Sequence, residues 1–191
     1  MAQERLITQI DYARAGKITP QMEAVAAKEH KTSEEIRAGV AKGCIAIPAN
    51  IHHAALSPEG VGEGMRTKVN VNLGISGDLM NAEMELEKVR TAIELGAEGI
   101  MDLSNHGKTH DFRKHLIDMS PAMIGTVPMY DAIGYLEKPL IGITAQDFLD
   151  VVRAHAEDGV DFVTIHAGMN RRTIENFKET GRLMNIVSRG G

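Results

Sequence analysis

Side chains able to bind a polar ligand recur at the ends of short apolar runs along this 191-residue chain. Five such runs cover residues 68–73, 99–103, 124–129, 161–166 and 185–188. The side chains at or just after their ends are Asn70 and Asn72, Met101 and Asp102, Tyr130, His166, then Ser188 and Arg189. Amide, phenol, hydroxyl and imidazole groups exchange hydrogen bonds with polar ligands, and a guanidinium binds anionic oxygens. The repeated placement predicts one site built from several strand ends.

The last of these groups has the composition of a phosphate site. Ser188, Arg189 and Gly190 combine a hydroxyl, a guanidinium and a glycine whose backbone amide can approach an anion closely. The alternative is a flexible segment without a role, because paired glycines are also common in loops.

Histidine, tyrosine and asparagine at the other ends each have a functional and a structural interpretation. His166 ends an apolar run and is either a ligand-binding side chain or one bonded to a backbone carbonyl. Tyr130 either contacts a ligand or anchors a loop through its hydroxyl. Asn72 shares an alternating face with Lys68 and Asn70, and that face points either into a site or toward the surface. The position of these residues in one series favours function.

Neighbouring residues Met101 and Asp102 must point to opposite sides of their strand. Only one of them can face the site. A methionine there would supply apolar contact.

Helical patterns separate the apolar runs. Residues 82–95 have a helical apolar stripe, and residues 144–158 begin with a capping box of Thr144 and Asp147. Alternating strands and helices indicate a parallel sheet, because parallel neighbours need a crossover connection. No Gly-x-Gly-x-x-Gly follows the first strand, so the pattern favours a TIM-type (β/α)8 barrel over a doubly wound sheet.

Two parts are expected along the chain. Residues 1–66 form an N-terminal layer, with a helix opened by Thr19-Pro20, a helix over 33–42 and a short strand over 45–47. Residues 67–191 hold about five strand-helix units. Since eight strands are needed to close such a barrel, we expect the front part of a longer one.

Composition excludes several classes of partner. The formal net charge is -5 and the basic residues are dispersed, which argues against nucleic-acid binding. No apolar run reaches the length of a membrane span, and the N-terminus lacks the apolar segment of a signal peptide. A cytoplasmic protein with a small-molecule substrate is expected.

Cysteine and histidine usage gives no metal site in this chain. The single cysteine, Cys44, lies in an apolar run that predicts a buried, inert thiol, and one thiol can form neither an internal disulfide nor a Cys-x-x-Cys site. The other histidines lack metal-ligand spacing and are predicted to be solvated or structural: His52, His53, His106, His110 and His115.

Five segments together resemble the ThiC family of radical S-adenosylmethionine enzymes, from about residue 16 onward. They are Lys-Val-Asn-Val-Asn-Leu-Gly (68–74), Ile-Met-Asp-Leu-Ser (100–104), Ile-Gly-Thr-Val-Pro-Met-Tyr (124–130), Gly-Val-Asp-Phe-Val-Thr-Ile-His-Ala-Gly (159–168) and Ile-Val-Ser-Arg-Gly-Gly (186–191). The resemblance implies a carbon-carbon lyase that rearranges aminoimidazole ribotide with S-adenosylmethionine and a [4Fe-4S] cluster.

Carried over motif by motif, the resemblance implies substrate contacts from seven residues: Asn72, Met101, Tyr130, His166, Ser188, Arg189 and Gly190. Asn72, Tyr130 and His166 would hold the imidazole and ribose, and the last three residues the phosphate. The cluster cysteines and the ligands of a divalent metal, zinc or iron, would follow Gly191. This fragment alone would then be inactive, and the complete protein a homodimer.

Two activities occur in the family. Asn105-His106-Gly107 replaces a usual Thr-Gly, and Tyr130-Asp131-Ala132 replaces a usual Tyr-Gln-Ala, which favours 5-hydroxybenzimidazole synthase of anaerobic cobalamin biosynthesis. The alternative is phosphomethylpyrimidine synthase of thiamine biosynthesis. A second alternative is a noncatalytic ribonucleotide-binding module, and a third is an unrelated (β/α) barrel.

Overall fold

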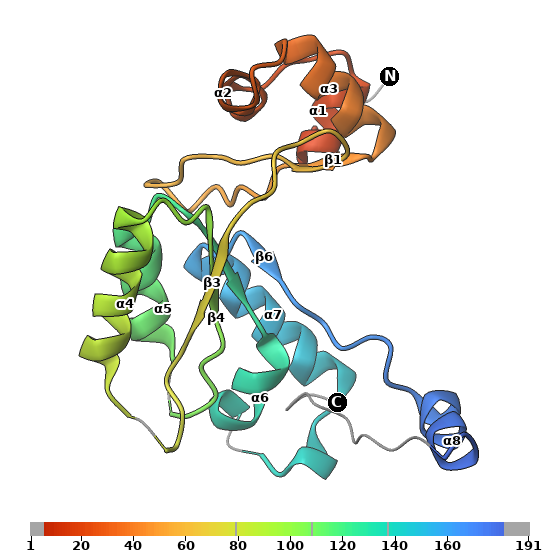
Figure 1. Cartoon of the computed structure of the whole chain (residues 1–191). Coiled ribbons are helices and arrows are strands. Elements are labelled where there is room, and N and C mark those ends of the chain that lie inside the picture. The colour runs from red at the N-terminus through yellow and green to blue at the C-terminus, as the bar shows by residue number, and fades with distance from the viewer. Residues whose placement is uncertain (1–5, 79, 108, 137, 182–191) are drawn as a thin grey trace.

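Short helices and short strands make up the computed structural model, which describes residues 6–181 apart from 79, 108 and 137 (Figure 1). The helices are α1 (Gln9–Arg14), α2 (Pro20–Glu29), α3 (Ser33–Lys42), α4 (Ala82–Glu94), α5 (His110–Met119), α6 (Pro128–Leu136), the 3-10 turn η1 (Leu140–Gly142), α7 (Ala145–Asp158) and α8 (Arg171–Glu179). The strands are β1 (Ile45–Ala46), β2 (Val61–Gly62), β3 (Asn70–Leu73), β4 (Gly99–Asp102), β5 (Met123–Thr126) and β6 (Phe162–Val163).

Strands β3 to β6 form a parallel sheet in chain order, β3-β4-β5-β6. Their register places Asn72 beside Met101 and Met101 beside Gly125. Helices connect each strand to the next, as parallel pairing requires. The α/β class predicted from the sequence is therefore confirmed. The four strands of this sheet do not close into a barrel within the described residues.

One face of this sheet carries the main hydrophobic core. Leu73, Ile100 and Ile124 pack there against Val89 of α4 and Leu116 of α5. Because side chains alternate along a strand, the opposite face receives Asn70, Asn72 and Met101. The sequence thus separates a helix-covered apolar face from a face with polar groups.

Helices α1 to α3 form a second hydrophobic cluster at the other end of the molecule (Figure 1). Thr19 caps α2 with Pro20 at its first position, and Gly43 ends α3 in the left-handed conformation, at φ 77°. Both helices begin where the sequence predicted. The predicted strand over 45–47 is shortened to β1, which pairs with β2.

All four predicted ranges for the parallel strands within the described residues differ from the observed strands at one or both ends. The range 68–73 begins only at Asn70 and the range 99–103 ends at Asp102, and two other ranges differ more. The strand expected over 124–129 stops at Thr126, because Pro128 opens α6 instead. Proline lacks an N–H and has a fixed φ, which suits a first helical position and not a central strand. The strand expected over 161–166 covers Phe162–Val163 only. The range 185–188 lies outside the described residues.

Candidate functional site

The sheet face opposite the helices carries the first group of predicted site residues. Asn70 and Asn72 are both exposed there, and the Asn70 amide donates a hydrogen bond to Asn72 Oδ1 over 3.0 Å. Met101 lies in the same row and is half-buried, whereas Asp102 points to the helix side and is buried. Met101 is thus the member of the pair that shares a face with Asn72.

Lys68 does not join this row, contrary to the alternating pattern. Its ammonium pairs with the Glu29 carboxylate of α2, before β3 begins at Asn70. The ionic partner and not strand periodicity therefore fixes this side chain.

Tyr130 and His166 form the second group. The two rings contact each other with centroids 5.6 Å apart and planes inclined by 38°. Tyr130 is in the first turn of α6 and His166 follows β6, so two chain segments far apart in sequence converge. Ser188, Arg189 and Gly190 lie outside the described residues, so their predicted phosphate contacts remain a prediction.

A buried polar network behind Tyr130 was missed by the sequence analysis. Arg113 of α5 donates from Nε and Nη2 to Asp158 Oδ2, at 2.8 and 2.7 Å, and from Nη1 to Asp131 Oδ2 at 3.2 Å. His155 Nε2 lies 3.0 Å from the same Asp131 oxygen, and its Nδ1 lies 2.8 Å from the Thr126 hydroxyl. These five residues link α5, α6 and α7 to the end of β5.

One sequence signal could have found the network. Arg113 stands three and four positions before Leu116 and Ile117, so it shares the apolar face of α5. A guanidinium on such a face needs a buried anionic partner. The sequence does not indicate which carboxylates supply it.

Electrostatics differ between the two buried carboxyls near this network. Burial alone would raise the pKa of Asp131, but hydrogen bonds from His155 and Thr109 and the charge of Arg113 outweigh it, so the pKa is lowered. Burial dominates at Asp102 and raises its pKa, although Ser104 hydrogen bonds oppose the shift. Asp131 is therefore held as the anion beside the Arg113 guanidinium.

The turns after β3 and β4 are fastened to each other. Asp102 Oδ1 accepts from the Ser104 amide at 2.9 Å, and Ser104 Oγ accepts from the Ile75 amide at 2.9 Å. The buried Glu85 carboxylate accepts from the Gly74 amide, also at 2.9 Å. These bonds stabilise the chain immediately after Asn72 and Met101.

His53 is structural, one of the two roles predicted for it. Its Nδ1 lies 2.7 Å from Asp161 Oδ2 and its Nε2 2.8 Å from the Ser120 carbonyl, with the His53 and Asp161 side chains fully buried. Burial would lower the pKa of His53, but the hydrogen bonds that its ring donates to the Asp161 carboxylate and the Ser120 carbonyl, with the charge of Asp161, outweigh burial and raise the pKa. The pair lies at the amino ends of β5 and β6.

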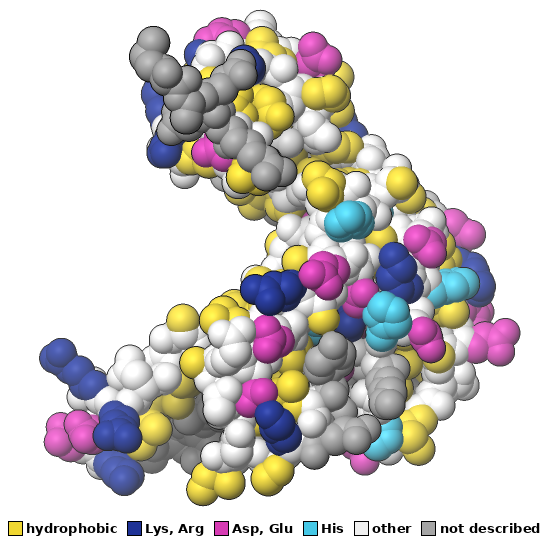
Figure 2. Space-filling model, turned by 180° about the vertical axis from the view of Figure 1, so that it is seen from behind, with side chains coloured by type: hydrophobic (Ala, Val, Ile, Leu, Met, Phe, Trp, Pro, Cys, Tyr) yellow, Lys and Arg dark blue, Asp and Glu magenta, His cyan; other side chains and the backbone are white. Residues whose placement is uncertain are grey.

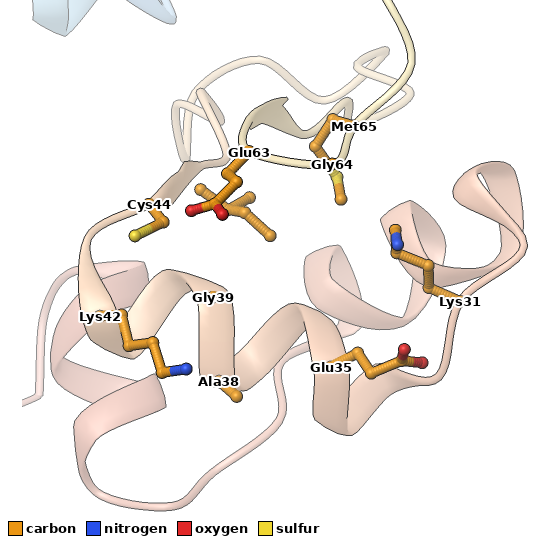
Figure 3. Close-up of a pocket in the computed structure, with 10 residues that line it drawn as sticks. Lys31, Glu35, Ala38, Gly39, Lys42, Cys44, Glu63, Gly64 and Met65 are labelled. Carbon is orange, nitrogen blue, oxygen red and sulfur yellow. The ribbon is translucent and has the colours of Figure 1, made fainter.

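Cys44 is exposed, contrary to the prediction of a buried thiol. Ile45 and Ile47 point into the N-terminal cluster, and strand alternation therefore turns Cys44 outward. It borders a shallow hollow of about 390 Å³ between α3 and residues 63–65 (Figure 3). Lys31, Glu35 and Lys42 also line this hollow, which gives it mixed charge.

Within the described ranges, no three histidine, cysteine, aspartate or glutamate side chains are grouped to hold a metal ion. None of the helices described there is long and apolar enough to cross a membrane.

On the face shown in Figure 2, basic and acidic side chains are interspersed. That mixture fits the dispersed charge of the sequence.

The chain is similar to several phosphomethylpyrimidine synthases. Identity is 64% to the enzyme of Alkaliphilus metalliredigens, 61% to that of Clostridium tetani and 60% to that of Clostridium perfringens strain SM101, each over 184 residues and 96% of this chain. The chain spans about two fifths of these relatives, covering 42%, 40% and 42% of their respective lengths.

These relatives overturn the preference for 5-hydroxybenzimidazole synthase. Relatives at 59–64% identity carry the name of the thiamine enzyme, which was the alternative. One departure that favoured the other branch, Asp131, is buried among Arg113 and His155. It therefore reflects helix packing and is a poor guide to the product.

The model of the Radical SAM ThiC family matches residues 8–191. The match contains all five segments that suggested the resemblance, together with the helices between them. The recognition from sequence is confirmed: this chain belongs to the Radical SAM ThiC family.

Proposed function

We propose that the protein containing this chain is a phosphomethylpyrimidine synthase. It converts aminoimidazole ribotide to 4-amino-5-hydroxymethyl-2-methylpyrimidine phosphate in thiamine biosynthesis. The observation that carries the proposal is the 64% identity to an enzyme of that name over 96% of the chain. The convergence of Tyr130 and His166, both assigned to the substrate by the family resemblance, supports it.

Each substrate residue has a role suited to its chemistry. The Asn72 amide can donate to and accept from ribose hydroxyls, and Met101 offers apolar contact beside it. The Tyr130 hydroxyl and the His166 imidazole orient the aminoimidazole ring. Ser188, Arg189 and the Gly190 amide bind the phosphate, because a guanidinium and backbone N–H groups suit anionic oxygens.

The remainder of the fold is proposed to complete a (β/α)8 barrel. Chain-order parallel pairing with α4 and α5 on one face supports this arrangement, since doubly wound sheets place helices on both faces. The polar row of Asn70 and Asn72 would then face the barrel interior.

The cluster implied by the family does not fit the described residues. A [4Fe-4S] cluster requires several cysteine thiolates, whereas this chain contains only Cys44. The described residues contain no cluster of three or more histidine, cysteine, aspartate or glutamate side chains that could hold a metal ion. We therefore propose that the cluster, S-adenosylmethionine and any divalent metal are held elsewhere in the protein.

The test is an anaerobic assay of the full gene product with aminoimidazole ribotide and S-adenosylmethionine, with the product identified by mass. The pyrimidine phosphate is expected, and any other product overturns the proposed function. His166→Ala should lower kcat/KM about tenfold or more, because the contact of a half-buried imidazole with the substrate is lost. His52→Ala, an exposed histidine, is the control. Equal activity of the two variants would refute the role of His166.

A further inference from the structure

The network of Arg113, Asp158, Asp131, His155 and Thr126 lies directly behind the proposed site. All five members are buried, with relative exposures of 1% for Arg113, 6% for Asp158, 4% for Asp131, 1% for His155 and 2% for Thr126. Burial of so many polar groups is costly unless each one is bonded. Hydrogen bonds connect all five, so the network holds its elements in one arrangement.

Asp131 is the point at which this network reaches α6. It immediately follows Tyr130 in the chain, and its carboxylate is held from α5 by Arg113 and from α7 by His155. Two bonds from different helices fix both the position and the rotation of the first turn of α6. The same turn carries the Tyr130 ring that contacts His166.

The rest of the network braces these two donors. Asp158 accepts two bonds from Arg113 through one oxygen, which fixes the guanidinium plane. Thr126 ends β5 and bonds His155 Nδ1, so the imidazole is positioned relative to the sheet itself. A rigid path therefore runs from the sheet to the Tyr130 turn.

We propose that Asp131 is a positioning residue for ribotide binding, which acts by fixing Tyr130 against His166 through its bonds to Arg113 and His155. This inference rests on the proposed function, because Tyr130 is taken as a substrate contact. Asp131 itself touches no substrate in this arrangement. Asp131 instead fixes the position of the Tyr130 hydroxyl before the ribotide binds.

A double-mutant cycle on ribotide binding tests the inference. The Kd for aminoimidazole ribotide is measured by calorimetry on the full gene product with Asp131→Asn, Tyr130→Phe and both changes. Each single variant should weaken binding about tenfold, and the double variant also about tenfold, because both act through one contact. Wild-type affinity of Asp131→Asn, or an additive loss of about a hundredfold in the double variant, would overturn it.

A matched control separates positioning from general destabilisation. Asp161→Asn removes a carboxylate that is equally enclosed but pairs with His53 at the amino ends of the strands. It should lower thermal stability and leave the Kd of the folded protein unchanged. If Asp161→Asn weakens binding as much as Asp131→Asn, the effect is one of stability and the inference fails.

A second pair of variants covers the case in which Asp131→Asn does not fold. His155→Gln keeps an amide that can donate to Asp131 and accept from Thr126, whereas His155→Leu can do neither. We expect near-normal ribotide affinity from His155→Gln and about tenfold weaker binding from His155→Leu. Equal affinities would overturn the inference. If the unsubstituted protein does not bind the ribotide, the proposed function fails instead.

Discussion

His53 and Asp161 form a pair with both side chains fully enclosed at the amino ends of β5 and β6. Asp161 also accepts backbone hydrogen bonds from Ile124 at 2.8 Å and Asn50 at 2.9 Å. The loop around His53 is therefore attached to the sheet through one carboxylate. Because Asp161 favours the charged imidazole, the strength of this attachment depends on pH.

The sign of that dependence follows from the raised pKa of His53 in the folded protein. Stabilisation is fully present below the unfolded-state pKa of about 6.5 and is lost as pH rises through the folded-state pKa. From about pH 6 to about pH 8, the free energy of unfolding should fall more steeply in the wild type than in His53→Gln. Urea unfolding at both pH values measures this difference. His52→Gln should show the same pH dependence of the free energy of unfolding as the wild type. The same pH dependence in His53→Gln would contradict a stabilising role for the His53 and Asp161 pair.

Gly74 allows the turn after β3 to pass close to the turn after β4. Its φ is +149°, and an added Cβ would lie 2.6 Å from the Ser104 amide nitrogen. Gly74→Ala should therefore destabilise the fold by about 3 kcal/mol or more, through backbone strain and overlap together. Gly96→Ala, at φ +80° with nothing within 4 Å of the added carbon, should cost about 1 kcal/mol. Thermal unfolding of both variants provides the comparison, and equal losses would show that close approach does not matter at Gly74.

Helix boundaries were predictable where a local signal decides them. The Thr144 and Asp147 capping box was read from the sequence, and both of its hydrogen bonds are present at the start of α7. The start of α6 was not predicted, because the apolar run continues through Pro128 and was assigned to a strand. The preference of proline for the first helical position decides the structure there. The Arg113 network was missed for another reason. Its partners Asp131 and Asp158 are distant in sequence, so only the packing of α5, α6 and α7 brings them together.

The capping box of α7 predicts a measurable local stability. Thr144 Oγ1 accepts from the Asp147 amide at 3.2 Å, and the Asp147 carboxylate accepts from the Thr144 amide at 3.0 Å. Thr144→Ala should lower the free energy of unfolding by about 1 kcal/mol, because the amide loses its partner. Thr91→Ala, an exposed position inside α4, should change stability by less than about 0.5 kcal/mol. Urea unfolding followed by circular dichroism distinguishes the two, and similar small effects would contradict the capping role.

The two hydrophobic clusters of the molecule are joined by a network of ion pairs. Lys68 and Arg66, which precede β3, reach Glu29 at the end of α2, and Arg66 also pairs with Glu98 before β4. Lys28 of α2 bonds Glu59 at 2.7 Å. Burial would raise the pKa of Glu29, but the Lys68 and Arg66 contacts outweigh it, and the pKa is lowered. The layer of α1 to α3 is thus attached to the sheet unit by ion pairs whose carboxylates are nearly enclosed, whereas the Arg66 side chain is 47% exposed.

The Lys68 and Glu29 pair should contribute most to this attachment, because both side chains are nearly enclosed, at 8% and 2% exposure. Lys68→Met removes the closest ionic partner of the buried Glu29 carboxylate and should lower the free energy of unfolding by about 3 kcal/mol. Adding Glu29→Gln to that variant should recover part of the loss, since no buried charge is then left uncompensated. Arg153→Met breaks an exposed pair with Asp150, at 67% and 50% exposure, and should cost less than about 1 kcal/mol. Urea unfolding of the four proteins measures these differences. If Lys68→Met were as mild as Arg153→Met, or if the second substitution made it worse, the pair would not hold the two clusters together.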